Sequence, residues 1–146
     1  MNIGARIEAR YRPEHGRKPV LISTVEELDS LVDELLTGPP DSNAAILHSM
    51  DRERLPTGVP DHYLWVGVDR DVNLGFVTFV DEGGNFTSLG SPETRTAPVY
   101  CIAGQSTECT DHSEIPIEFV RQAVKEFLTS GGKRPACIEW QNEFPS

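Results

Sequence analysis

The sequence of 146 residues is poor in cysteine and has no long apolar run. Its three cysteines, Cys101, Cys109 and Cys137, are an odd number without a close pair, which favours a reducing compartment over a disulfide scaffold. No segment resembles the hydrophobic stretch of a secretory signal, and none is long enough to span a membrane. We therefore expect a cytoplasmic protein that has no membrane partner.

Positive charge is also scarce, with 13 Lys and Arg residues against 23 Asp and Glu residues and a net charge of −10. The first twenty residues carry five basic side chains against two acidic ones, so the remainder carries eight against twenty-one. Nucleic-acid phosphates repel such an acidic body, whereas a basic protein partner is attracted and meets it faster. We expect no direct binding of nucleic acid; the alternative is that the charge only keeps the protein soluble.

Metal-binding motifs are incomplete in this sequence. Asp69, Asp71 and Asn73 have the spacing that opens a calcium loop. That loop also needs a glycine at its sixth position and a glutamate at its twelfth, and these positions hold Leu74 and Val80. The segment is better explained as the corner between two strands, so we expect no calcium site.

Catalytic motifs are missing as well. Cys109 and His112 form one loose pair with no second pair, which a structural zinc site would need. The acidic neighbours of Cys109 disfavour a nucleophilic thiolate. The glycine pairs of "EGGNF" and "SGGKRP" do not open a helix, so neither forms a phosphate-binding loop. We predict no enzyme activity, no catalytic residue, no metal and no cofactor.

Two segments have the periodicity and end signals of helices. Thr24 followed by Glu27 fits a capping box, and apolar residues then recur at helical spacing until Gly38. A second helix should start near Pro116, because the first turn of a helix does not need the N–H group that proline lacks. A glycine pair and a proline end it.

Short β-rich runs surround these helices. We predict strands over residues 3–11, 43–50, 64–80 (as a hairpin), 98–105 and 136–141. A three-residue hairpin loop with Asn73 in the left-handed conformation would place Trp65 and Phe79 on one face and Val66 and Phe76 on the other. We predict one α+β domain over residues 1–146, with a largely antiparallel sheet of about five to seven strands and two main helices packed on one face.

Three strings carry a family resemblance: "STVEELDSLVDELL", "LWVGVDRDVNLGFVTFVDEGGNFTSLG" and "EIPIEFVRQAVKEFLTSGGKRPACIEWQ". In this order, over residues 24–141, they resemble immunity protein family one, the deaminase-associated immunity proteins of actinobacterial polymorphic toxin systems. The resemblance implies an α+β protein that is not an enzyme. It also implies an antitoxin-like inhibitor that binds a toxin encoded beside it, commonly a nucleic-acid deaminase, and protects the producing cell.

An acidic inhibitor would suit the basic substrate groove of such a toxin, and we expect a monomer in the complex. Tight interfaces draw much of their energy from aromatic anchors ringed by polar contacts. We therefore predict a partner-binding surface from the hairpin corner and the next turn, with one aromatic anchor. Its residues are Trp65, Asp69, Arg70, Asp71, Asp81, Glu82, Asn85 and Phe86.

Two other functions are compatible with the sequence. One is a small enzyme or ligand-binding domain with a pocket on the apolar sheet face, lined by Trp65, Phe79 and Phe86. The other is a structural or assembly module that pairs with itself through an exposed sheet edge or the second apolar sheet face.

Overall fold

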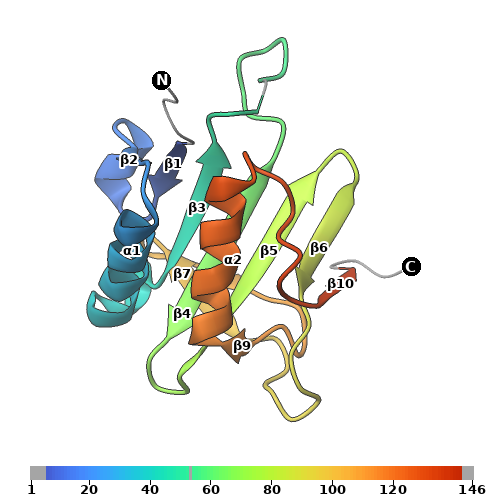
Figure 1. Ribbon diagram of the computed structural model, residues 1–146. Coiled ribbons are helices and arrows are strands. Elements are labelled where there is room, and N and C mark those ends of the chain that lie inside the picture. The colour runs from blue at the N-terminus through green and yellow to red at the C-terminus, as the bar shows by residue number, and fades with distance from the viewer. Residues whose placement is uncertain (1–5, 53, 143–146) are drawn as a thin grey trace.

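The computed structural model describes residues 6–52 and 54–142, which form an α+β fold (Figure 1). Its elements are β1 (Ile7–Arg10), the 3-10 helix η1 (Pro13–Gly16), β2 (Val20–Ile22), α1 (Val25–Thr37), the 3-10 helix η2 (Pro40–Ser42), β3 (Ala44–Ser49), β4 (Tyr63–Asp69), β5 (Leu74–Asp81), β6 (Gly84–Ser88), β7 (Val99–Ile102), β8 (Gln105–Glu108), β9 (Ile115–Pro116), α2 (Ile117–Thr129) and β10 (Trp140–Asn142). The start of the predicted first strand, residues 3–5, lies outside the described residues.

The main sheet has eight strands, in the order β10-β6-β5-β4-β3-β1-β2, with β9 paired to the start of β5. Every pair is antiparallel. The predicted class and antiparallel sheet are confirmed. The strand predicted at 98–105 forms over the shorter range of β7. It does not join the main sheet but pairs with β8 in a separate two-stranded sheet.

Both predicted helices form, and both lie on one face of the sheet (Figure 1). The capping box of α1 is present, since the Glu27 N–H donates to Thr24 Oγ1 and the Thr24 N–H donates to Glu27 Oε1, each at 3.1 Å. Pro116 is the N-cap of α2, and Gly131 follows its end at a φ of 75°. Each helix has 13 residues, and neither is long and apolar enough to cross a membrane.

Apolar residues are buried on both faces of the sheet. On the helix face, residues such as Val66 and Phe79 pack with Val124 and Phe127 of α2 in the main core. On the opposite face, a small cluster of Ala44, Phe76 and Tyr100 lies beneath the β7–β8 hairpin. This hairpin covers only part of that face, so Trp65 is left half-buried.

The register predicted for the β4–β5 hairpin is wrong by one residue. Trp65 pairs with Thr78, and Leu64 pairs with Phe79. Asp69 explains the shift, because its carboxylate accepts the N–H of Asp71 at 2.9 Å and starts the turn earlier than expected. A slip of one residue exchanges the faces of one strand. Phe79 therefore packs under the helices, while Phe76 and Trp65 lie on the other face.

The last strand is shorter than the predicted 136–141, because β10 begins only at Trp140. Residues 137–139 are irregular and carry a single sheet-like contact, in which the Leu89 N–H donates to the Glu139 carbonyl at 2.9 Å. Their side chains are therefore free to line a groove beside the sheet.

Candidate partner-binding surface

The hairpin corner contributes fewer available charges than its sequence indicates. The Asp69 carboxylate accepts a hydrogen bond from Arg95 Nη2 at 3.0 Å and is only partly exposed. Arg70 is exposed, with Nη1 3.5 Å from the Leu36 carbonyl. Asp71 is exposed at the tip of the loop. Of the two acidic residues, Asp71 is the one whose carboxylate is available to a partner.

The second predicted cluster lies at the opposite end of β5, in and beside the turn that contains Asp81, Glu82, Asn85 and Phe86. The eight residues of β5 span roughly 25 Å. Asp81 is 3.6 Å from Arg52 Nη1, and the Arg134 guanidinium lies 4.0 Å from the Phe86 ring centroid. The structure therefore does not bring the corner and this turn together.

Trp65 lies in a third place, which we call the Trp65 hollow. This hollow has a volume of about 380 Å³. It is lined by Arg10, Arg12, Ile46, Trp65, Ile102 and Thr107, among others. The lining contains two arginines and no carboxylate. The Trp65 indole N–H is buried and has no hydrogen-bond partner among the described residues.

The ligand pocket imagined between Trp65, Phe79 and Phe86 is not formed. Phe79 is buried beneath α2, with its ring centroid 6.4 Å from that of Phe127. Trp65 faces the other side of the sheet. No cavity found among residues 6–52 and 54–142 is lined by all three aromatic residues.

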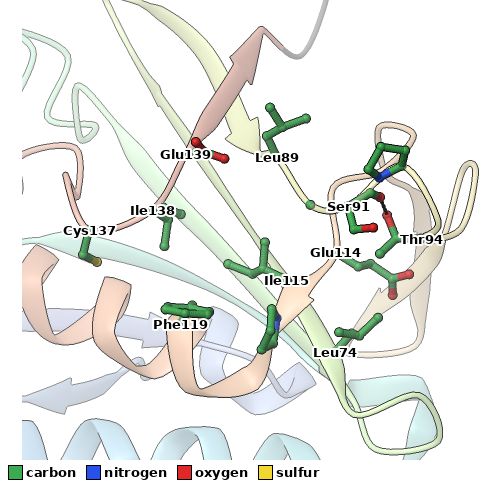
Figure 2. Close-up of a pocket in the computed structure, with 13 residues that line it drawn as sticks. Leu74, Leu89, Ser91, Thr94, Glu114, Ile115, Phe119, Cys137, Ile138 and Glu139 are labelled. Carbon is green, nitrogen blue, oxygen red and sulfur yellow. Dashed lines mark hydrogen bonds between the residues drawn. The ribbon is translucent and has the colours of Figure 1, made fainter.

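A larger groove lies where no site was predicted, between the first turn of α2, β9 and residues 137–139 (Figure 2). We call it the Phe119 groove. It has a volume of about 650 Å³. Its lining includes Leu74, Leu89, Ile115, Phe119, Ile138 and Glu139, and Figure 2 shows Leu89, Ile138 and Phe119 around Ile115. Leu89 and Phe119 are 39% and 38% exposed, so the groove presents apolar surface to solvent.

One sequence signal could have indicated this groove. Ile117, Val120, Val124 and Phe127 form the buried stripe of α2. Phe119 lies off that stripe, and a large aromatic residue outside the core-facing stripe of a helix points to a contact other than the core. Phe119 was not among the predicted site residues.

The walls of the Phe119 groove are held in place by backbone contacts. The Gly90 N–H donates to the His112 carbonyl at 2.7 Å, and the Leu89 N–H donates to Glu139. A Cβ atom at Gly90 would lie 1.9 Å from the Glu114 carbonyl oxygen, so only glycine allows this close approach. The groove is therefore formed before any partner arrives.

An ion pair between the buried Glu114 and the partly exposed Arg95 supports the wall that carries Glu114. The Glu114 side chain is fully buried and accepts hydrogen bonds from Arg95 Nε at 2.9 Å and Nη2 at 2.6 Å. The Tyr100 hydroxyl donates to the same carboxylate at 2.5 Å. Arg95 also binds Asp69, so this network links the predicted hairpin corner to the Phe119 groove.

Two members of this network, Tyr100 and Arg95, have raised pKa values. Burial, reinforced by the hydrogen bond to Glu114, raises the pKa of the Tyr100 phenol well above its usual value. The hydrogen bond to Glu114 raises the pKa of the Arg95 guanidinium. Since Arg95 balances the buried Glu114 charge, the negative potential of the groove comes from its rim. There Glu93, Glu118 and Glu139 are exposed and form no ion pair within the described ranges.

The buried histidine His62 does not offer a catalytic base. His62 Nδ1 lies 2.9 Å from the Asp61 carboxylate, and Nε2 accepts the Ser49 N–H at 2.8 Å. Burial lowers the pKa of His62, so the ring is neutral with both nitrogens occupied. A general base needs a nitrogen within reach of its substrate, so this Asp–His pair is structural.

Cysteine and metal chemistry find no clear site in the described part of the chain. Cys137 is an exposed residue, but partial burial of its thiol and a hydrogen bond with Glu126 raise the pKa to about 11. The thiol is therefore protonated at neutral pH. No group of three or more His, Cys, Asp or Glu side chains within 6–52 and 54–142 is arranged to hold a metal ion.

Comparison with known families decides between the remaining classes. The model of the family described as Immunity protein Imm1 matches residues 16–142, which include both helices and every wall of the Phe119 groove. The chain belongs to the immunity protein Imm1 family. This confirms the resemblance seen in the sequence. Membership in Imm1 gives the chain the role of an immunity protein, which binds a cognate toxin, and favours an inhibitor over an enzyme. No curated protein sequence matches it significantly.

Proposed function

We propose that this Imm1 protein neutralises a nucleic-acid deaminase toxin by occupying its basic substrate site. The supporting observation is the distribution of charge. Residues 69–118 carry nine acidic side chains and two basic ones, and one of those two, Arg95, is bound to Asp69 and Glu114. An enzyme that acts on nucleic acid needs a basic surface for phosphates, and the acidic segment complements that surface.

Inhibition of this kind needs no covalent step. Carboxylates of the immunity protein take the positions of phosphates, and the bulk of the domain excludes the nucleic-acid strand. Complementary charge speeds the encounter, which matters because the toxin and its inhibitor are made in the same cell. Stable protein interfaces of this type bury about 1,600 Å² in total, or about 800 Å² from each partner, which is a small part of the 7976 Å² surface of this chain.

The test uses the full chain and the toxin domain encoded beside it. Binding kinetics would be measured at about 0.05 M and about 0.5 M salt, since screening weakens charge attraction over this range. Deaminase activity on single-stranded and double-stranded DNA and on RNA would be followed with and without the immunity protein. We expect an association rate that falls with salt and full loss of activity at one equivalent. A complex that still deaminates its substrate would contradict occlusion, and an absence of binding would contradict the proposed function.

A further inference from the structure

We propose that the Phe119 groove is the surface that receives the toxin, and that it takes an apolar toxin side chain flanked by lysine or arginine. This inference rests on the proposed function and specifies its site. Leu89 and Phe119 stand on facing walls of one hollow, with Ile115 and Ile138 between them (Figure 2). Such a hollow suits a projecting apolar anchor, which loses its contact with water on insertion.

The charge at the rim defines the neighbours of that anchor. Glu118 precedes Phe119 in the first turn of α2, Glu139 lines the groove, and Glu93 lies in the loop that follows Leu89. All three carboxylates are exposed. The lining contains no lysine, arginine or histidine. A partner with a cation beside its apolar anchor is attracted here, whereas an acidic or nucleic-acid partner is repelled.

The fixed walls add to the case. The backbone contacts of Leu89 and Gly90 hold the groove open without a ligand. The Glu114–Arg95 pair secures the segment that leads into β9. A preformed site loses little conformational entropy when it binds, and more of the contact energy then appears as affinity.

The other hollows fit a basic partner less well. The Trp65 hollow has no carboxylate in its lining, and its Arg10 and Arg12 already lie 3.9 Å from Glu8 and Glu34, so it offers a basic partner no charge to bind. A third hollow contains the exposed residues Leu55 and Val59 together with two aspartates. Both aspartates lie within 4 Å of Arg52, so that hollow has little charge to offer. Apolar exposure and unpaired carboxylates coincide in the Phe119 groove.

The decisive experiment compares two matched substitutions in the full chain, Phe119→Asp and Leu55→Asp. Each places a carboxylate at an exposed apolar position in a hollow. Binding to the toxin domain encoded beside this chain would be measured, with circular dichroism and thermal unfolding to check the fold. We expect Phe119→Asp to weaken binding by roughly 100-fold, mainly through faster dissociation, and Leu55→Asp to change it by less than about threefold.

A second measurement needs no variant. Cys137 is exposed and lines the groove, so a bound toxin should protect it from a maleimide. Labelling would be run at about pH 8.5, because the raised pKa of Cys137 leaves little reactive thiolate at neutral pH, with Cys101 as the internal control read by mass spectrometry. We expect labelling of Cys137 to slow at least about tenfold in the complex, as for a residue inside a water-excluding interface. If the wild-type chain binds its toxin but Cys137 labels at the free rate and Phe119→Asp binds normally, the groove proposal is overturned while the proposed function stands. If the wild-type chain does not bind, both proposals fail.

Discussion

The Phe119 groove and the Trp65 hollow are both lined by aromatic and aliphatic side chains, but their charged neighbours have opposite signs. Both are open, both are lined by an aromatic residue with aliphatic neighbours, and each could hold a side chain of a partner. The groove has carboxylates at its rim and no cation in its lining, whereas the hollow is lined by Arg10 and Arg12. An aromatic residue at a concave surface therefore does not identify the binding site by itself. Charge decides between the two.

This difference follows from how charge is distributed along the chain. The basic excess of the first twenty residues reaches the surface at β1 and η1, which flank the Trp65 hollow. Part of the acidic excess of residues 69–118 lies at the Phe119 groove, where Glu93 and Glu118 neighbour lining residues. The electric field of a basic partner orients a chain with such separated charge before contact. The Phe119 groove would therefore face the toxin when the two proteins meet.

The largest expected effect tests the support of the groove. Arg95→Ala leaves the buried Glu114 carboxylate with the Tyr100 hydroxyl and no cation. Breaking a fully buried ion pair lowers the free energy of unfolding by about 3–5 kcal/mol. Because the Arg95 side chain is 44% exposed, we expect a smaller loss of about 2–3 kcal/mol, measured by urea denaturation. The control is Arg121→Ala, whose partners Asp29 and Asp33 are exposed, and its loss should stay below about 1 kcal/mol. Equal losses in the two variants would contradict the conclusion that the Glu114–Arg95 pair supports the wall of the Phe119 groove.

The next effect tests the charge of the two regions with one matched change. Glu139→Lys reverses a carboxylate at the Phe119 groove, and Glu14→Lys makes the same change in η1, beside the Trp65 hollow. Both alter the net charge equally. At low salt we expect Glu139→Lys to slow association with the toxin about tenfold and Glu14→Lys to slow it less than about twofold. Stopped-flow kinetics measures both rates, and similar rates would show that only total charge matters.

Local features of the fold could be predicted from the sequence. The Thr24–Glu27 capping box and Pro116 each act within a few residues, so both helix starts were predicted correctly. The hairpin register was predicted wrongly. Asn73 has the expected left-handed conformation, with a φ of 57°, but that conformation does not distinguish a three-residue loop from the longer loop that forms between Asp69 and Leu74. The loop length depends on the contact between Asp69 and the Asp71 N–H, which the sequence does not distinguish from a later turn.

The Phe119 groove could not be predicted because four distant segments build it. The segments are Leu74, residues 89–94, residues 114–119 and residues 137–139, and they meet through the pairing of β9 with β5 and of β10 with β6 and through the backbone contacts of Leu89 and Gly90. Strand order is a non-local property, and no motif in one chain encodes it. The predicted hairpin corner was close to the groove, since Asp69 and Glu114 share Arg95. The predicted turn at Asp81 was at the wrong end of β5 to join it.

A smaller effect concerns the stability of the fold in acid, which depends on His48. This residue contacts Arg10, which lines the Trp65 hollow. His48 contacts Arg10 at 3.4 Å, and burial, together with the charges of His62 and Arg10, lowers its pKa to about 4. In the unfolded chain a histidine titrates near 6.5. Between pH 6.5 and 4 the unfolded state therefore binds more protons, and stability falls as the pH decreases.

Urea denaturation at pH 7 and pH 5 measures this effect. We expect a loss of about 1 kcal/mol, after allowance for the partial exposure of His48. The loss should shrink in His48→Gln, which cannot gain the proton. The lining of the Phe119 groove contains no histidine, so toxin affinity of the folded protein should change little over the same range. A large change in affinity that His48→Gln abolishes would move the binding surface to the histidine side.

The smallest expected effect concerns Trp65 itself. Its indole N–H is buried without a partner among the described residues, and an unsatisfied donor weakens the folded state. Trp65→Phe removes that donor and keeps an aromatic ring against Phe76. The packing that is lost and the cost of the unsatisfied donor that is removed should nearly cancel, so the free energy of unfolding should change by less than about 1 kcal/mol. Toxin affinity should change less than about twofold, because hollows outside an interface contribute little to binding. A loss above tenfold by calorimetry, with the fold intact, would instead assign the anchor to the arginine-lined hollow and reverse the comparison between the two regions.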